Sequence, residues 1–340
     1  MQARNSNEAY YRQVVTVLGI GTLFFLLFLL LISGAVAVLT VLLAVLPLSP
    51  LAAKLLYQLT YGALYLAAFL CPIPIMKRLM RARGLPWGAA RTSRGVSRAL
   101  PLIVLGGMAV ILAQSYINAG LVGFFDFDRL FENTLPSTDG SMTGLDLLLS
   151  VLVMAAVPAF CEEFLFRGAI LTNLLPFGRS TAVLVSALAF ALMHQNPAQF
   201  LYAFGAGILL GTVCERTGSI WNCVFLHFFN NASSLLSIVL PQWLGKEKGT
   251  VVLLILDVLL VLSGLISVIL LTRRSSRKPD LRDGAFGRSL PQADGYAACR
   301  VAPERSVRLL LASPFGVFLI ACAVMGILTV LTLTLAGGTV

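Results

Sequence analysis

The chain has 340 residues, of which 58% are hydrophobic and only 12% are charged. Soluble domains keep about a quarter of their residues charged, so this composition excludes most soluble proteins and predicts an all-α, polytopic integral membrane protein. The net charge of +10 does not indicate a nucleic-acid partner, because the basic residues fall in short blocks between apolar runs, as they do in the loops of membrane proteins.

Nine apolar segments are predicted to form transmembrane helices, since about 20 residues of helix cross the hydrocarbon core of a bilayer. The first segment is long for one crossing, so we expect its helix to be tilted or broken near Ser33–Gly34. The fifth, which ends at His194, is marginal on its own. In chain order the segments are Val14–Leu46, Leu51–Ile75, Ala99–Gly123, Leu145–Leu175, Thr181–His194, Pro197–Cys214, Ser219–Leu240, Thr250–Thr272 and Leu309–Ala336.

The loop charges predict the orientation of these helices. Basic residues crowd the loop Lys77–Arg98 and open the loop Arg273–Arg308, which we expect to be a flexible connector. The segment Phe124–Gly144 instead carries four acidic residues against one arginine. By the positive-inside rule the two basic loops and the N-terminus face the cytoplasm, and the acidic segment faces outside. We expect the protein to lie in the plasma membrane.

Two adjacent glutamates and an arginine interrupt the fourth apolar segment, in the stretch CEEFLFRGAI. Each charge costs about 2.5–3.5 kcal/mol at the centre of a spanning helix. On a helix, Glu163 and Arg167 lie on one face in the order that favours an ion pair. Glu162 is rotated by about 100° from Glu163 and is left as a surplus carboxylate, the kind of group that serves as a general base or acid. A buried ion pair that locks two helices is the purely structural alternative.

The only two histidines of the chain, His194 and His227, both lie in apolar segments. Phe190 shares a helix face with His194, and His227 shares one with Asn231, since each pair is four residues apart. Hydrolysis of an amide needs a base for water and hydrogen-bond donors for the developing oxyanion. A histidine and an asparagine on one helix face can supply those donors without a serine or cysteine nucleophile.

Three ordered patterns in this region resemble the motifs of the CAAX protease and bacteriocin-processing (CPBP, or Abi) family of intramembrane proteases, which includes the type II CAAX prenyl endopeptidases. The approach to the third pattern, RTGSIWNCVFLHFFNN, is similar to that family as well. The resemblance covers roughly Leu145–Leu240. The patterns are Glu162-Glu163-x-x-x-Arg167, Phe190-x-x-x-His194 and His227-x-x-x-Asn231.

The resemblance implies an intramembrane endopeptidase acting on a membrane-embedded or lipidated peptide in a cavity open to the cytoplasm. Glu162 would activate the attacking water, and Glu163 and Arg167 would form the supporting pair. His194, His227 and Asn231 would complete the catalytic site. We therefore expect a four-helix catalytic core at 145–240, preceded by N-terminal helices at 1–144 and followed by C-terminal helices at 241–340.

The sequence does not decide whether the protein uses a metal, and it is compatible with two other functions. Glu162, His194 and His227 could hold zinc with an open position for water, but the H-E-x-x-H helix of common zinc proteases is absent, and we expect a metal-free enzyme. A catalytically silent scaffold or immunity protein of the same family is one alternative. A proton-coupled transporter is another, since such proteins also carry intramembrane Glu, Arg and His, but no internal repeat is visible.

Overall fold

The computed structural model describes residues 2–88, 95–124, 144–277 and 301–337, and within these ranges every regular element is a helix. Eight helices of the described chain are long and apolar enough to cross a membrane. A ninth apolar helix, α9 (Arg179–Met193), has 15 residues and is shorter than a full crossing. The prediction of an all-α polytopic membrane protein is confirmed, and the segment ending at His194 is indeed the short one.

The N-terminal helix α1 (Gln2–Val45) runs without a break for 44 residues, so the break considered near Ser33–Gly34 does not occur. At 1.5 Å per residue it is about 66 Å long, roughly twice the hydrocarbon thickness. Its first half is buried through residues such as Val14, Leu18 and Phe25, whereas its second half exposes large apolar side chains. Such exposed apolar surface on a long helix is suited to contact with lipid.

The helices that follow α1 begin where the sequence supplies the appropriate starting residues. Ser49 caps α2 (Pro50–Leu70) by accepting a hydrogen bond from the Ala52 amide, and Pro50 occupies its first turn, where a missing N–H is harmless. The amphipathic α3 (Pro72–Ala82) follows at once, and its buried face includes Met76 and Met80. The predicted loop Lys77–Arg98 therefore begins as helix, and residues 89–94 of it lie outside the described residues.

The central segment that carries the two glutamates is one long helical run with changing geometry. It follows α4 (Leu100–Phe124) and consists of α6 (Gly144–Ser150), η2 (Val151–Ala156), α7 (Val157–Glu163), η3 (Phe164–Leu171), α8 (Thr172–Leu174) and η4 (Leu175–Phe177), in which η2 and η3 are π-helices. Most of the acidic segment predicted between α4 and α6, residues 125–143, lies outside the described residues.

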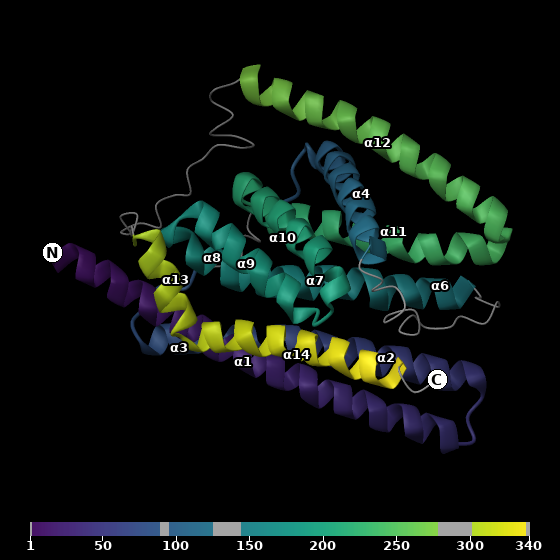
Figure 1. The fold of residues 1–340 in the computed structure, drawn as a ribbon, viewed down its shortest axis with the longest axis horizontal. Helices are drawn as coiled ribbons and strands as arrows, with labels where there is room; N and C mark the ends of the chain where they lie inside the picture. Colours follow the sequence, from purple (N-terminus) through teal and green to yellow (C-terminus); the bar gives the residue numbers. More distant parts are fainter. Residues whose placement is uncertain (1, 89–94, 125–143, 278–300, 338–340) are drawn as a thin grey trace.

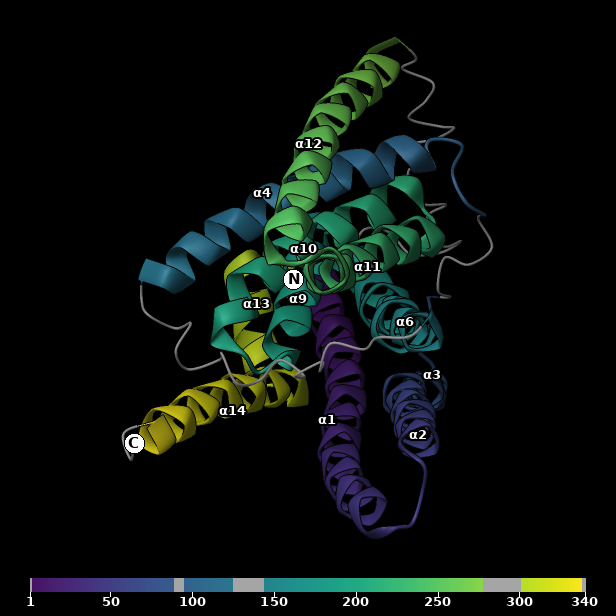
Figure 2. The same ribbon diagram turned by 90° about the vertical axis from the view of Figure 1, so that its right-hand side faces the viewer.

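The remaining helices form a hairpin, two long crossings and a C-terminal pair. After α9 come α10 (Pro197–Thr217), α11 (Ile220–Leu244), α12 (Lys246–Arg277), α13 (Pro303–Leu311) and α14 (Pro314–Gly337). The predicted connector Arg273–Arg308 is thus helical at both ends, and its residues 278–300 lie outside the described residues. Figures 1 and 2 show α9, α10, α11 and the α6–α8 run lying between α4 and α12 on one side and α1, α2 and α14 on the other.

The helix ends that carry basic residues gather at one end of the bundle. The Gly88 amide donates to Asn173 Oδ1 over 2.9 Å, and the Ser97 amide donates to Asn222 Oδ1 over 3.0 Å. The N-terminal Glu8 pairs with Arg305 of α13 over 3.1 Å. The N-terminus, α3 and α13 lie at one end of the bundle, on the left in Figure 1. That this end faces the cytoplasm stays a prediction from the loop charges.

Candidate active site

The two glutamates lie on α7, a short α-helical segment between two π-helices. Pro158 at the start of α7 has no N–H to donate and crowds the carbonyl of the preceding turn, and the π-helix η2 ends just before it. Turns of π-helix are rare in proteins, and those that occur are often found at functional sites. The side chains of Glu162 and Glu163 are only 4% and 0% exposed, so both carboxyl groups must find their partners within the protein.

Glu163 is the centre of a buried ionic cluster. Its Oε1 atom accepts a hydrogen bond from Arg167 Nη1 over 2.8 Å and lies 2.9 Å from His227 Nδ1. Arg167 is fully buried, and its Nη2 donates to the Gly207 carbonyl over 3.2 Å. The guanidinium carbon also lies 4.5 Å above the ring of Phe190, a cation–π contact. The predicted Glu163–Arg167 pair is therefore present, and it is tied to α9, α10 and α11.

Gly207 allows α10 to approach this cluster. A Cβ atom at this position would lie 3.0 Å from both Cα and Cβ of Ala187 on α9, closer than ordinary van der Waals contact. The absence of a side chain brings the backbone of α10 against α9 and places the Gly207 carbonyl within reach of Arg167. Close packing of small residues of this kind is typical of membrane helices.

Glu162 has a different set of neighbours. Its Oε1 atom accepts a hydrogen bond from the hydroxyl of Tyr65 on α2. Its Oε2 atom is buried, has no hydrogen-bond partner in the part of the chain that the structure describes, and lies 3.8 Å from Nε2 of His227. That separation is too long for a direct hydrogen bond and is of the kind that a bridging water occupies. Glu162 thus keeps one carboxylate oxygen available, as the surplus-carboxylate prediction requires.

The contact with Glu163 determines which ring nitrogen of His227 carries hydrogen. An ionised carboxylate can only accept, so the 2.9 Å contact requires a proton on His227 Nδ1. Nε2 is then the ring atom directed at Glu162 Oε2. A neutral ring offers this Nε2 as an acceptor, and a doubly protonated ring offers it as a donor. A carboxylate that orients a histidine in this way is a recurring device of hydrolytic sites.

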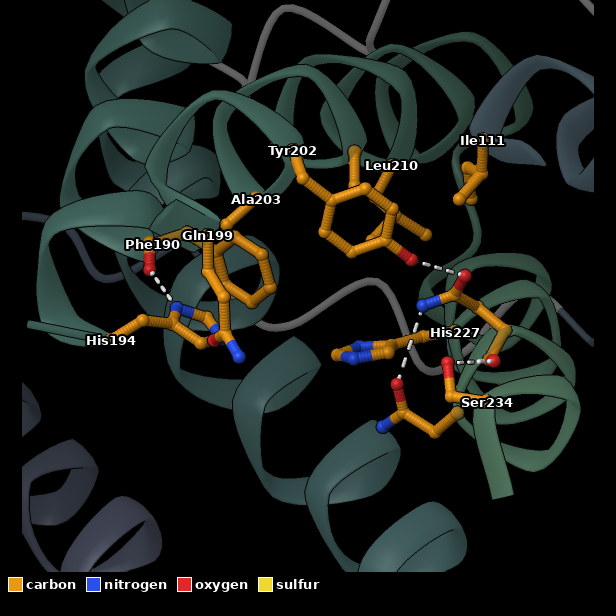
Figure 3. Close-up of a pocket in the computed structure, with 12 residues that line it drawn as sticks. Ile111, Phe190, His194, Gln199, Tyr202, Ala203, Leu210, His227 and Ser234 are labelled. Atoms are coloured by element: carbon orange, nitrogen blue, oxygen red, sulfur yellow. Dashed lines mark hydrogen bonds between the residues drawn. The ribbon is translucent and has the colours of Figure 1, made fainter. Parts of the chain in front are cut away.

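A cavity of about 210 Å³ lies beside the cluster, between α4, α9, α10 and α11. Figure 3 shows His194 and His227 lining it from different helices. Within its wall, the Tyr202 hydroxyl donates to Asn230 Oδ1 over 2.7 Å, and Asn230 Nδ2 donates to Asn231 Oδ1 over 3.3 Å. No hydrogen bond donated by Asn231 Nδ2 is found among the described residues, so this amide nitrogen is available to a ligand in the cavity. The lining residues are Ile111, Phe190, His194, Gln199, Tyr202, Ala203, Ala206, Leu210, His227, Asn230, Asn231 and Ser234.

The structure joins four of the six predicted site residues in one cluster and leaves two outside it. The cluster is connected by N···O distances of 2.8–3.8 Å and consists of Glu162, Glu163, Arg167 and His227. Of this cluster only His227 lines the cavity, and Asn231 lines it from the same helix. His194 lines the cavity as well, but the bond that its Nδ1 makes is to the Phe190 carbonyl, 2.8 Å away. Among the described residues, no three His, Cys, Asp or Glu side chains are close enough together to hold a metal ion.

Three residues of the site, Tyr65, Tyr202 and Asn230, are not indicated by the sequence patterns. Tyr65 lies 97 residues before Glu162, in a helix whose tyrosines at 57, 61 and 65 recur every four residues, so its pattern resembles ordinary aromatic packing. Tyr202 carries no local signal that separates it from other aromatic residues in the spans. Asn230 is the one with a usable signal, because it lies beside Asn231 in the polar end of the stretch HFFNN.

Comparison with known protein families agrees with the motifs. A family model described as "Type II CAAX prenyl endopeptidase Rce1-like" matches residues 144–233, about a quarter of the chain, and confirms the resemblance found from the three patterns. The matched range contains every residue of those patterns. No curated protein matches the chain. No solved structure matches it either.

Proposed function

We propose, from the match of residues 144–233 to the type II CAAX prenyl endopeptidases, that this protein is an intramembrane endopeptidase that hydrolyses a peptide bond of a membrane-associated substrate. The observation that carries the proposal is the buried Oε2 atom of Glu162, which has no hydrogen-bond partner among the described residues and lies 3.8 Å from His227 Nε2. Glu163 Oε2 is buried without a partner as well, but the other oxygen of Glu163 is committed to Arg167 and His227. A helix-locking ion pair does not need this second carboxylate, because Glu163 already pairs with Arg167.

In the proposed mechanism, Glu162 acts first as a general base and then as a general acid. Its Oε2 accepts a proton from a water held between the carboxylate and His227, while the water oxygen attacks the carbonyl carbon of the scissile bond. The C–N bond then breaks, and the protonated Glu162 returns its proton to the leaving amine. Each turnover consumes one water and restores the carboxylate.

The oxyanion formed in this step needs hydrogen-bond donors in a place that excludes bulk water. The amide nitrogen of Asn231 is suited to this role, because its Oδ1 is already engaged by Asn230. His227 in its doubly protonated form provides a second donor through Nε2. Glu163 and Arg167 hold His227 in place through the 2.9 Å contact, so their contribution is to orient the ring. We propose that His194 contributes from the cavity wall, where it binds the substrate and not the water.

We propose that hydrolysis proceeds without a metal. A catalytic zinc would need Glu162, His194 and His227 around one point, and the described residues hold no group of three such ligands. His194 Nδ1 is bonded to a backbone carbonyl, and no contact joins this side chain to either glutamate in the described chain. The residues as arranged do not fit a zinc centre, so no step is assigned to one.

The substrate that fits this site is a membrane-embedded or lipidated peptide. The cavity volume of about 210 Å³ is below the 300–1,000 Å³ that is typical of small-molecule pockets, so it suits a short stretch of extended peptide while the remainder of the substrate stays in the bilayer. We propose that the cavity is reached from the cytoplasmic side. Asn173 lies at the basic end of the bundle and is 11 residues from Glu162, which is about 16 Å of helix.

The test uses purified full-length protein in proteoliposomes with two fluorogenic peptides, one prenylated at a C-terminal cysteine motif and one an unmodified membrane-spanning peptide. Cleavage of either peptide by wild-type protein, together with its loss in Glu162→Gln, supports the proposed function. Cleavage that persists in Glu162→Gln contradicts the proposed mechanism. If no cleavage occurs, a comparison of membrane peptides from deletion and wild-type cells is the next assay, and an unchanged peptide profile would overturn the protease proposal.

A further inference from the structure

Among the hydrogen bonds of the described residues, Glu162 has one partner outside the family-matched range 144–233. That partner is Tyr65. It lies on α2, which packs against both α7 and η2. Its hydroxyl donates to Glu162 Oε1, because an ionised carboxylate has no hydrogen to give. A helix from the N-terminal region therefore reaches directly to the carboxylate that is proposed to activate water.

The ring of Tyr65 is held by a stack of aromatic side chains. Its centroid lies 4.6 Å from that of Phe69 and 5.9 Å from that of Tyr61. Phe69 is only 1% exposed and lies 4.6 Å from Phe25 of α1 and 6.5 Å from Phe166 of η3. Aromatic contacts at these distances are favourable beyond simple burial. The hydroxyl of Tyr65 thus occupies a position that is set by packing on both sides of its ring.

The Tyr65 hydroxyl fixes the orientation of the Glu162 carboxylate. The terminal torsion of a glutamate is broad, so burial alone does not orient the two oxygens. With Oε1 engaged by Tyr65, Oε2 is the oxygen that faces His227 Nε2 at 3.8 Å and has no partner of its own. Glu163 is oriented independently, by Arg167 and His227. The two adjacent glutamates are therefore held by separate sets of donors.

We infer that Tyr65 is a positioning residue for the hydrolysis, which holds Glu162 with one oxygen directed at the attacking water. The inference rests on the proposed function, in which Glu162 is the base. Tyr65 does not contact the substrate in this role, and its effect is exerted through Glu162. Loss of the hydroxyl leaves the carboxylate free to rotate, so the fraction of molecules in the productive geometry falls, whereas binding of the peptide in the neighbouring cavity is unaffected.

The experiment compares Tyr65→Phe with Tyr61→Phe, a matched control that removes the same hydroxyl from the neighbouring ring of the stack. Each variant is purified as full-length protein, checked for folding by size exclusion and thermal unfolding, and assayed per folded protein with the prenylated fluorogenic peptide. Tyr65→Phe should lower kcat about ten- to a hundred-fold, the effect of losing a hydrogen bond to a charged group. Its KM should stay within about two-fold, as expected when ground-state binding is intact, and Tm should be unchanged. Tyr61→Phe should retain the wild-type kcat.

Three outcomes decide between the possibilities. A wild-type kcat in Tyr65→Phe, with Glu162→Gln inactive, overturns the role of Tyr65 and leaves the proposed function standing. A kcat that falls equally in both tyrosine variants, together with a lowered Tm, shows that the stack supports only the fold and also overturns the role. Activity that persists in Glu162→Gln contradicts the proposed function itself, whatever the tyrosine variants do.

Discussion

Glu163 Oε1 lies 2.9 Å from His227 Nδ1, although the two residues are 64 positions apart in the sequence. Both side chains are buried, and the same oxygen accepts a hydrogen bond from Arg167. One carboxylate oxygen therefore joins α7, η3 and α11. This relationship makes Glu163 a structural centre of the site and separates its role from that of Glu162, which shares none of its hydrogen-bond donors.

The first prediction concerns the division of roles between the adjacent glutamates. Glu163→Gln should destabilise the protein by about 3–5 kcal/mol, because it leaves the buried Arg167 without its counter-charge. Glu162→Gln should leave the protein folded and abolish turnover, since Tyr65 can still donate to the amide oxygen. Thermal unfolding of both variants in the same detergent, with peptide cleavage measured in parallel, checks this. Equal losses of stability would contradict it.

The second prediction concerns His227. On the sequence alone, His227→Ala would be expected to remove an oxyanion donor and leave folding nearly intact. The structure changes that expectation, because the variant also removes one of two donors to Glu163. We expect kcat to fall by about 10²–10³-fold, and stability to fall by about 1.5–3 kcal/mol, the net contribution of one hydrogen bond to a charged group.

His194→Ala is the matched control for that experiment. His194 lines the same cavity, but its Nδ1 is bonded to a backbone carbonyl and not to the cluster. His194→Ala should raise KM and leave Tm nearly unchanged. Thermal unfolding and steady-state kinetics of both variants provide the comparison, and a stable His227→Ala protein would show that Arg167 alone suffices to hold Glu163.

The third prediction concerns the metal. Elemental analysis of active, purified protein should find no stoichiometric zinc, and activity should survive prolonged treatment with a chelator. The physical reason is that the described residues hold no three-ligand group, with His194 turned toward the Phe190 carbonyl. A zinc site would instead lose activity to chelator and regain it with added metal. One equivalent of zinc that tracks activity across preparations would contradict the metal-free mechanism.

The fourth prediction concerns sidedness in the membrane. In a cysteine-free background that retains activity, Arg83→Cys should react with a membrane-impermeant thiol reagent only when the cytoplasmic face is accessible. Ser137→Cys, in the acidic segment, should react from outside in intact cells. The reason is the excess of basic residues in the loop that follows α3 and of acidic residues in the segment before α6. Labelling of both positions from the same side would contradict the predicted topology.

Local features of the site could be predicted from the sequence. Glu163 and Arg167 are four residues apart, and helical geometry alone places such a pair in contact, as the 2.8 Å bond confirms. The contact between Phe190 and His194, with ring centroids 5.0 Å apart, follows from the same spacing. The π-helices on either side of α7 had no such signal, because residue spacing in the sequence does not distinguish a turn of π-helix from one of α-helix.

Contacts between distant segments could not be predicted in the same way. The sequence indicates that Arg167 pairs with Glu163 and not with Glu162. It does not indicate that Tyr65 donates to Glu162, because α2 and α7 are brought together only by the packing of whole helices. The sequence also treats the two histidines alike, whereas the structure joins His227 to Glu163 and leaves His194 at the cavity wall.

By itself, the sequence determined that the chain is a helical membrane protein with a buried Glu–Arg pair, because hydrophobic length and helical spacing are local properties of a chain in a bilayer. Only the tertiary structure decided which oxygen of Glu162 is left without a partner, which nitrogen of His227 faces it, and which tyrosine orients it. Those choices depend on differences of about 1 Å between side chains on separate helices, and hydrogen bonds form or fail within that distance.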